Sequence, residues 1–347
     1  MIRFLSIAFF AFSILLLSSC ASPKVGFTYL ESAQIDIPTY IKSLVVVDHS
    51  APKNGTWDIL EGGLTGENIG QDREGVLNLI AGVKEIGLQS NRYSLSKESK
   101  RYGKGKLFEN IPEPMAITLI KSIGRKHGAD AVLAIDKFDS DFITTNRRLE
   151  DEDPEEEGGK PIPQYKVTGV ATITAYIRMY EVKTGNILDE IKHSYTYSYH
   201  ATAKTVAQAL LLLIQKQKAV NSVSYEAGIK YGKRVAPSEV YVKRSFYKRP
   251  TKKNPAFDRG VRNAEVGDWK KAINDFEMAS KGRDLKIAGR AAYNLAICYE
   301  VLGELKTAEK WAQKSYVTFG FKKGVDYQRL LSRRITDSNR LQQQLKE

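Results

Sequence analysis

Apolar and polar residues alternate along two long stretches in the middle of the chain. From Val167 to Tyr180 the apolar side chains fall mostly on every second position, with threonines between them. The alternation returns from Ile191 to Tyr199, after the turn formers Thr184-Gly185-Asn186. Because successive side chains of a strand point to opposite faces, the pattern predicts a long antiparallel hairpin with one buried face.

Shorter apolar runs and helical spacings precede this hairpin. The runs Ser43–Asp48 and Ala131–Ile135 predict buried strands. Apolar positions three and four residues apart predict helices over Arg73–Leu88 and Met115–His127. The first half of the chain is therefore expected to be an α/β domain.

Helical spacing resumes after the hairpin. Residues 203–232 are predicted to form one long helix, and Val240–Tyr247 one further strand. Paired basic residues and Pro250 surround that strand, which indicates a linker over 248–255. The five apolar residues Leu210–Ile214 are too few to span a bilayer, so we expect them to pack in a core.

A short pattern occurs twice near the C-terminus. Gly267 and Gly303 lie 36 positions apart, as do Ala272 and Ala308. The pattern resembles the tetratricopeptide (TPR) repeat, whose period is 34, with glycine permitting the interhelical turn and alanine the close helix packing. The resemblance implies repeats at about 253–284 and 289–320, followed by a capping helix at 326–345.

The TPR resemblance also implies which side chains would face a partner. In such repeats the first helix of each pair lines the concave face. Seven residues would then line a groove for a peptide or a helix: Asn254, Phe257, Val261, Arg290, Tyr293, Ile297 and Glu300. The alternative is that the capping helix or the 203–232 helix fills this groove, because two repeats leave little of it free.

The first twenty residues predict where in the cell the protein is located. Arg3 precedes an apolar stretch shorter than a bilayer span. The stretch ends in Leu17-Ser18-Ser19-Cys20, which resembles a bacterial lipobox. This implies a signal peptide over 1–19, a diacylglyceryl anchor on Cys20 and a tether over 20–42. We expect attachment to the outer membrane, facing the periplasm, with surface exposure left open.

Charge separates the two halves of this 347-residue chain, whose net charge is +13. Residues 20–202 carry a net charge of −4, and residues 203–347 one of +16. The acidic loop 149–160 is predicted to be a solvated, mobile insertion. The basic half favours contact with anionic glycans or lipid headgroups, whereas the export signal argues against nucleic acid.

Patterns that would indicate catalysis or metal binding are weak. His193 and His200 lie seven residues apart on a predicted strand, hence on opposite faces. Three aspartates within 136–141 lack the glycine and distal glutamate of a Ca²⁺ loop, and the Gly-rich stretch 62–70 lacks a closing Gly-Lys-Ser/Thr. The lone thiol of Cys298 is expected to be buried. We therefore predict no cofactor, no metal ion and no enzymatic activity.

Two further resemblances concern larger parts of the chain. Residues Val45–Val47, 128–133 and 177–185 are similar to the α/β domain of envelope lipoproteins such as the curli secretion lipoprotein and the lipoprotein activators of peptidoglycan synthases. Cys20, 66–73, 129–136 and the repeat pair resemble an uncharacterised family of Gram-negative envelope lipoproteins with C-terminal TPR repeats. They imply an α+β fold, with a sandwich-like α/β domain over 43–250 and an all-α, TPR-like domain over 251–347.

These features together predict a lipid-anchored scaffold that binds an envelope protein. Two alternatives stay open. One is a subunit of an oligomeric outer-membrane secretion or assembly complex. The other is a protein that binds or hydrolyses cell-wall glycan, and a hydrolase would need a cleft with two carboxylates about 5–9 Å apart.

Overall fold

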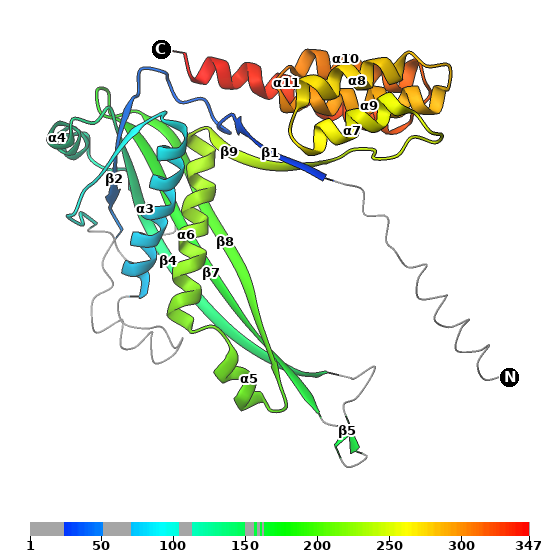
Figure 1. Cartoon of the computed structure of the whole chain (residues 1–347). Helices are drawn as coiled ribbons and strands as arrows, with labels where there is room; N and C mark the ends of the chain where they lie inside the picture. The colour runs from blue at the N-terminus through cyan, green and yellow to red at the C-terminus, as the bar shows by residue number, and fades with distance from the viewer. Residues whose placement is uncertain are drawn as a thin grey trace. The chain divides into compact units, whose positions relative to one another are not determined.

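The computed structural model describes residues 24–50, 71–103, 113–149, 156–157, 160–161 and 163–346 (Figure 1). Contacts divide these residues between two units. The sheet unit comprises residues 30–239 and 340–346, and the helical unit comprises residues 24–29 and 240–339. The predicted signal peptide, Cys20, the Gly-rich stretch 62–70 and most of the acidic loop lie outside the described residues.

A mixed five-stranded sheet forms the centre of the sheet unit, in the order β3-β2-β4-β7-β8. Its strands are β2 (Ser43–Asp48), β3 (Ser94–Lys97), β4 (Ala131–Leu149), β7 (Gln164–Glu181) and β8 (Ile187–Ala203). Strand β2 runs parallel to β3 and β4, and β7 runs antiparallel to β4 and β8. The predicted buried strands and the long hairpin are confirmed.

Strand β4 is much longer than the apolar run that predicted it. A register shift between Ile135 and Lys137 interrupts its pairing with β7, and the strand then continues to Leu149. Beyond the shift, Phe138 is still buried, but every side chain from Ile143 to Arg148 is exposed and all but Ile143 are polar. A strand that is solvated on one face has little apolar signal, which is why the sequence prediction ended at Ile135.

Helices cover both faces of this sheet. Helices α3 (Gln71–Ser90) and α6 (Lys216–Val235) lie side by side on one face (Figure 1), where their apolar residues join Leu44, Leu133 and Ile173 in one core. Helix α4 (Ile117–His127) packs Ile120 and Ile123 against side chains of the other face. The predicted helices over 73–88 and 115–127 are confirmed to within a few residues.

The predicted long helix over 203–232 is wrong at its start. Residue 203 ends β8, and Thr205 then caps a short helix, α5 (Val206–Leu212), by accepting a hydrogen bond from the Gln208 N–H. Leu213 is extended and buried, and it separates α5 from α6. Leu210, Leu211 and Leu212 are exposed, so only part of the predicted apolar run packs in a core.

The described part of the acidic loop is paired. Within 149–160, Leu149 ends β4, and β5 (Glu156–Glu157) pairs with β6 (Lys160–Pro161). The solvation and mobility of the loop stay predictions.

The helical unit is an array of consecutive helices that packs around its own core. The helices are α7 (Pro255–Glu265), α8 (Trp269–Ser280), α9 (Leu285–Val301), α10 (Leu305–Val317) and α11 (Lys323–Gln344). Gly267 and Gly303 have φ values of 78° and 79°, and Ala272 and Ala308 are completely buried. Two strands, β1 (Lys24–Glu31) and β9 (Ser238–Ser245), pair with each other. The mixed α+β fold with a C-terminal helical array is confirmed.

The division between the units falls inside α11, after residue 339. The Gln344 side chain accepts a hydrogen bond from the Ala33 N–H at 2.8 Å and donates one to the Ala33 carbonyl at 3.1 Å. Both residues belong to the sheet unit. Among the described residues, no helix is long and apolar enough to cross a membrane.

Candidate functional site

The structure buries most of the side chains predicted to line an open groove. Phe257, Val261, Ile297 and Glu300 are all less than 9% exposed. Asn254 caps α7, where its side chain accepts a hydrogen bond from the Phe257 N–H at 2.9 Å. These five residues therefore do not form an accessible lining in the described part of the chain, and a partner bound through them stays a prediction.

A segment of the chain itself lies on this face, residues 244–249, which we call the strap. It begins in β9 and continues past the end of that strand. The Asn294 side chain accepts a hydrogen bond from the Tyr247 N–H and donates one to the Tyr247 carbonyl, both at 2.9 Å. Arg290 donates to the Arg249 carbonyl at 2.9 Å. The region 248–255, predicted to be a linker, is therefore partly bound to the helical array.

The Glu300 carboxylate ties the strap to two helices. Arg244 of the strap donates two hydrogen bonds to it, each of 2.8 Å, and Arg334 and Tyr327 of α11 also donate to it. Burial alone would raise the pKa of Glu300, but hydrogen bonds from Arg244, Tyr327 and Arg334 lower it below its ordinary value. The carboxylate therefore remains charged in an interior site because two guanidinium groups surround it.

Aromatic rings surround the other half of the strap. The Tyr247 ring lies edge-on to Tyr293 at 5.8 Å and to Phe321 at 5.3 Å between centroids. Tyr293 also contacts Tyr327 of α11 at 5.1 Å. Both the capping helix and the strap thus fill the face that the repeat pattern left open. The sequence had allowed for the helix but not for the strap.

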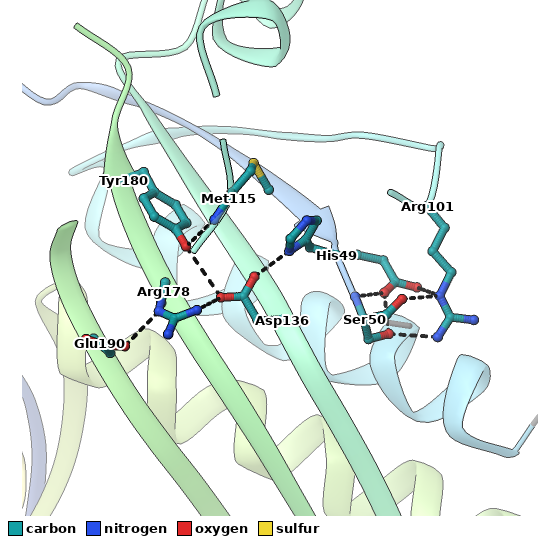
Figure 2. A network of polar contacts seen from close by, with 9 residues as sticks. His49, Ser50, Arg101, Met115, Asp136, Arg178, Tyr180 and Glu190 are labelled. Atoms are coloured by element: carbon teal, nitrogen blue, oxygen red, sulfur yellow. Dashed lines mark hydrogen bonds and ion pairs between the residues drawn. The ribbon is translucent and has the colours of Figure 1, made fainter. Parts of the chain in front are cut away.

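A second polar site lies in the sheet unit, at the end of β2 and beside the irregularity in β4 (Figure 2). Asp136 is buried and receives a hydrogen bond from Arg178 at 2.9 Å. Its other oxygen lies 2.7 Å from His49 Nδ1. Arg178 also donates to Glu190 at 2.7 Å, and its pKa is raised because these acceptors outweigh the effect of burial.

Tyr180 closes this site against the chain before α4. Its hydroxyl accepts a hydrogen bond from the Met115 N–H at 3.0 Å and lies 3.5 Å from Asp136. Burial, followed by the charge of Asp136, raises the pKa of Tyr180 to about 12. The phenol therefore stays protonated at neutral pH and is a poor base.

The neighbouring serine is engaged elsewhere. The Ser50 hydroxyl donates to Asp48 at 2.6 Å, and Arg101 donates to the Ser50 hydroxyl at 2.8 Å (Figure 2). His49 is oriented by Asp136, as in such a relay, but the Ser50 hydroxyl is bonded to Asp48 and Arg101, so Ser50, His49 and Asp136 do not form the relay that activates a serine nucleophile. The arrangement fixes the ends of three neighbouring strands.

The remaining candidates from the sequence are separated in space. His193 Nε2 lies 3.1 Å from the Ala227 carbonyl of α6, whereas His200 Nδ1 contacts Thr168 on the opposite face of the sheet. Burial raises the pKa of Cys298 to about 12, so its thiol is inert. Among the described residues, no group of three or more His, Cys, Asp or Glu side chains could hold a metal ion.

The sequence did not predict two features of these sites. The strap was interpreted as the end of a strand and the start of a linker, although Phe246-Tyr247 between paired basic residues is an unusual composition for a linker. Arg178 lies on the face of β7 that carries the threonines, and the alternation does not distinguish this end of that face from the rest. The structure shows that this end of the face is buried.

Comparisons with known proteins give matches to two family models and to several solved structures, three of which are described below. The C-terminal model, Domain of unknown function (DUF6340), matches residues 258–340. None of the curated proteins matches the chain.

The solved structures cover about half of this chain or more and share little sequence with it. A PelC dodecamer from Paraburkholderia phytofirmans is 10% identical, covering 61% of this chain and 99% of its own, with a TM-score of 0.21. A neuraminyllactose-binding hemagglutinin homologue from Helicobacter pylori is 13% identical, covering 58% and 87%, with a TM-score of 0.23. Lipoprotein GNA1162 from Neisseria meningitidis is 14% identical, covering 49% and 92%, with a TM-score of 0.18. Scores this low support no argument about this chain.

The N-terminal family model spans residues 41–247, which is well over half of the chain and nearly the whole sheet unit. On that match, at residues 41–247, the chain belongs to the family described as Domain of unknown function (DUF8603).

Proposed function

We propose that this protein is anchored by a lipid in the cell envelope and acts without catalysis, by binding another protein through its helical unit. The observation that carries the proposal is the pair of hydrogen bonds between Asn294 and Tyr247, in which one side-chain amide binds both backbone groups of a single residue. Sites that bind extended peptides use such backbone contacts for affinity and side-chain pockets for specificity.

The other parts of the proposal rest on the sequence. Leu17-Ser18-Ser19-Cys20 supports lipidation of Cys20 and attachment to the outer membrane, facing the periplasm. The two helical hairpins, with glycine turns at Gly267 and Gly303, support the assignment of a TPR-like array. The excess of Lys and Arg in the C-terminal half favours an acidic or anionic partner surface.

The test is photo-crosslinking in intact cells. A photoreactive amino acid replaces Lys323, an exposed residue of α11 whose ammonium lies 5.3 Å from the centre of the Tyr247 ring. The matched control carries the same amino acid at Leu88, which is 65% exposed on α3 of the sheet unit. We expect an envelope protein to be captured from position 323 and not from position 88.

Other results would favour other functions. A product of twice the chain mass would favour the oligomeric assembly, and equal capture from both positions would move recognition away from the helical unit. Truncation of Phe257 or Ile297 is unsuitable as a loss-of-binding variant, because removing a buried side chain of that size costs about 2–5 kcal/mol of stability.

A further inference from the structure

The strap is held by contacts to particular side chains as well as by contacts to its backbone. Arg244 reaches the buried Glu300 carboxylate, and Phe246 is 6% exposed in the core of the helical unit. Tyr247 lies among aromatic rings while its backbone is bound by Asn294. Three consecutive features of the face therefore match an arginine, a buried aromatic ring two residues later and a second ring next to it.

We infer that the strap occupies a peptide-binding site, and that this site takes an extended peptide with the pattern Arg-x-aromatic-aromatic from a partner protein, in competition with the strap. This inference rests on the proposed function, because it names the kind of ligand that the helical unit binds.

Each position of the pattern has a physical basis. A planar guanidinium can donate two parallel hydrogen bonds to one carboxylate, which lysine cannot do, so Glu300 favours arginine. The carboxylate is buried, so a ligand without that arginine would leave its charge less well compensated. The edge-on rings around Tyr247 favour an aromatic residue over an aliphatic one of similar size.

The strap can be exchanged without unfolding the helices that hold it. Strand β9 ends at Ser245, and beyond it the side chains of Asn294 and Arg290 bind the backbone of the strap. Lys248 and Arg249 are exposed. Release therefore breaks these contacts, frees the last two residues of β9 and exposes Phe246, but it leaves the backbone hydrogen bonds of α9 and α11 intact, as expected for a locally opening segment.

A ligand that is part of the same chain lowers the apparent affinity of any competing peptide. A short connection holds the strap at an effective concentration in the millimolar range. The apparent affinity for an external peptide equals the affinity of the open site multiplied by the fraction of molecules whose site is open. Weakening the strap should therefore strengthen the binding of an added peptide, which a purely structural strand would not do.

The experiment measures the binding of a fluorescent peptide with the sequence of residues 242–250 to the full chain, by fluorescence anisotropy. We expect the Arg244→Ala, Tyr247→Ala chain to bind it at least tenfold more tightly than the wild type. A peptide with alanine in place of Arg244 should lose at least tenfold in affinity. The matched control peptide, with alanine in place of the exposed Lys248, should bind like the parent.

Absence of binding to a variant chain with native circular dichroism and cooperative thermal unfolding would overturn the inference. Equal binding of the three peptides would also overturn it, because the site would then not distinguish the arginine of the peptide from alanine.

A second measurement uses the wild-type chain, in case the double variant does not fold. Hydrogen exchange compares the Tyr247 amide, bound to Asn294, with the amide of Leu295 in the buried part of α9. We expect Tyr247 to exchange at least 100-fold faster, and an excess of unlabelled peptide to accelerate Tyr247 alone. Exchange of both amides at one common rate, unaffected by peptide, contradicts an exchangeable strap.

The two proposals can fail separately. Capture of an envelope protein from position 323 without any peptide binding would reject the Arg-x-aromatic-aromatic ligand and retain the scaffold. Peptide binding without capture of any protein in cells would retain the site and reject the scaffold as the function of this chain.

Discussion

Two buried glutamates, Glu98 in the sheet unit and Glu300 in the helical unit, each accept hydrogen bonds from several donors. Glu98 contacts Lys126 Nζ at 2.6 Å and His127 Nε2 at 3.1 Å, and it accepts a further bond from the Lys100 N–H. Burial alone would raise the pKa of Glu98, but these donors lower it to about 2. Both carboxylates are thus charged and join separate parts of their own unit.

The low pKa of Glu98 predicts a dependence of stability on pH. A carboxylate whose pKa is lower in the folded state stabilises the fold above its unfolded pKa, and this contribution is lost as pH falls through the folded value. We expect the free energy of unfolding to fall between about pH 4.5 and pH 2, and Glu98→Gln to remove roughly 1–3 kcal/mol at neutral pH and flatten this part of the profile. Urea unfolding at several pH values measures it. Glu85→Gln, on the exposed face of α3, is the matched control and should leave the profile unchanged.

A single glycine sets the distance between α3 and α6. A Cβ atom at Gly228 would lie 2.0 Å from the Leu79 carbonyl oxygen, so alanine requires the two helices to separate. We expect Gly228→Ala to destabilise the protein by about 1–3 kcal/mol, although alanine is the better helix former. Thermal unfolding compared with Ser222→Ala, an exposed position on the same helix, tests this. Equal Tm values for the two variants would show that the helices adapt without cost.

Individual elements begin where side chains supply their caps. Asn254 accepts a hydrogen bond from the N–H of the third residue after it, at the start of α7, whereas Glu304 at the start of α10 makes no such side-chain bond. Asn254 was predicted to face a partner. The structure shows a local role for it as the cap of α7, and contact with a partner stays a prediction.

This difference between the caps predicts unequal effects of alanine. Asn254→Ala should cost about 1 kcal/mol of stability, because one N–H of the first turn loses its acceptor. Glu304→Ala, in the same helical array, should change stability less. Denaturant midpoints of the two variants provide the comparison, and the reverse order would contradict the cap assignment.

At the scale of the whole molecule, positive charge is concentrated in the helical unit. Residues 240–339 carry 22 Lys and Arg against 11 Asp and Glu. Lys306 and Lys310 lie one turn apart and exposed on α10. This unit should therefore dominate attraction to anionic surfaces, and salt should screen that attraction because the Debye length is about 10 Å at 0.1 M.

The charge distribution predicts binding to anionic polymers that depends on position and salt. We expect the full chain to bind immobilised heparin at low ionic strength and to elute as salt rises. Lys306→Glu, Lys310→Glu should elute at lower salt than Lys97→Glu, Lys183→Glu, which makes the same change in net charge in the sheet unit. Elution of both variants at the same salt concentration would mean that only net charge matters.

The pattern of the sequence was sufficient for elements whose buried side chains recur at a regular spacing and whose turns need a particular residue. The alternation from Val167 to Tyr180 determined a strand with one buried face, and Gly267 and Gly303 marked turns that need a positive φ. Where an element depended on distant contacts, the pattern failed. The polar end of β4 is a strand because β7 pairs with it, and α5 ends where Leu213 turns into a core formed by Val167 and Ala209.

The sequence by itself determined the fold class, the hairpin, the helical array and the charge asymmetry, because periodicity and turn residues act over a few positions. Only the tertiary structure decided what covers the array. Glu300 meets Arg244, 56 positions away, and Asn294 meets Tyr247, 47 positions away. A local pattern can mark a side chain as facing a groove. Whether that groove is open depends on packing between distant segments, which here places the chain's own strap on it.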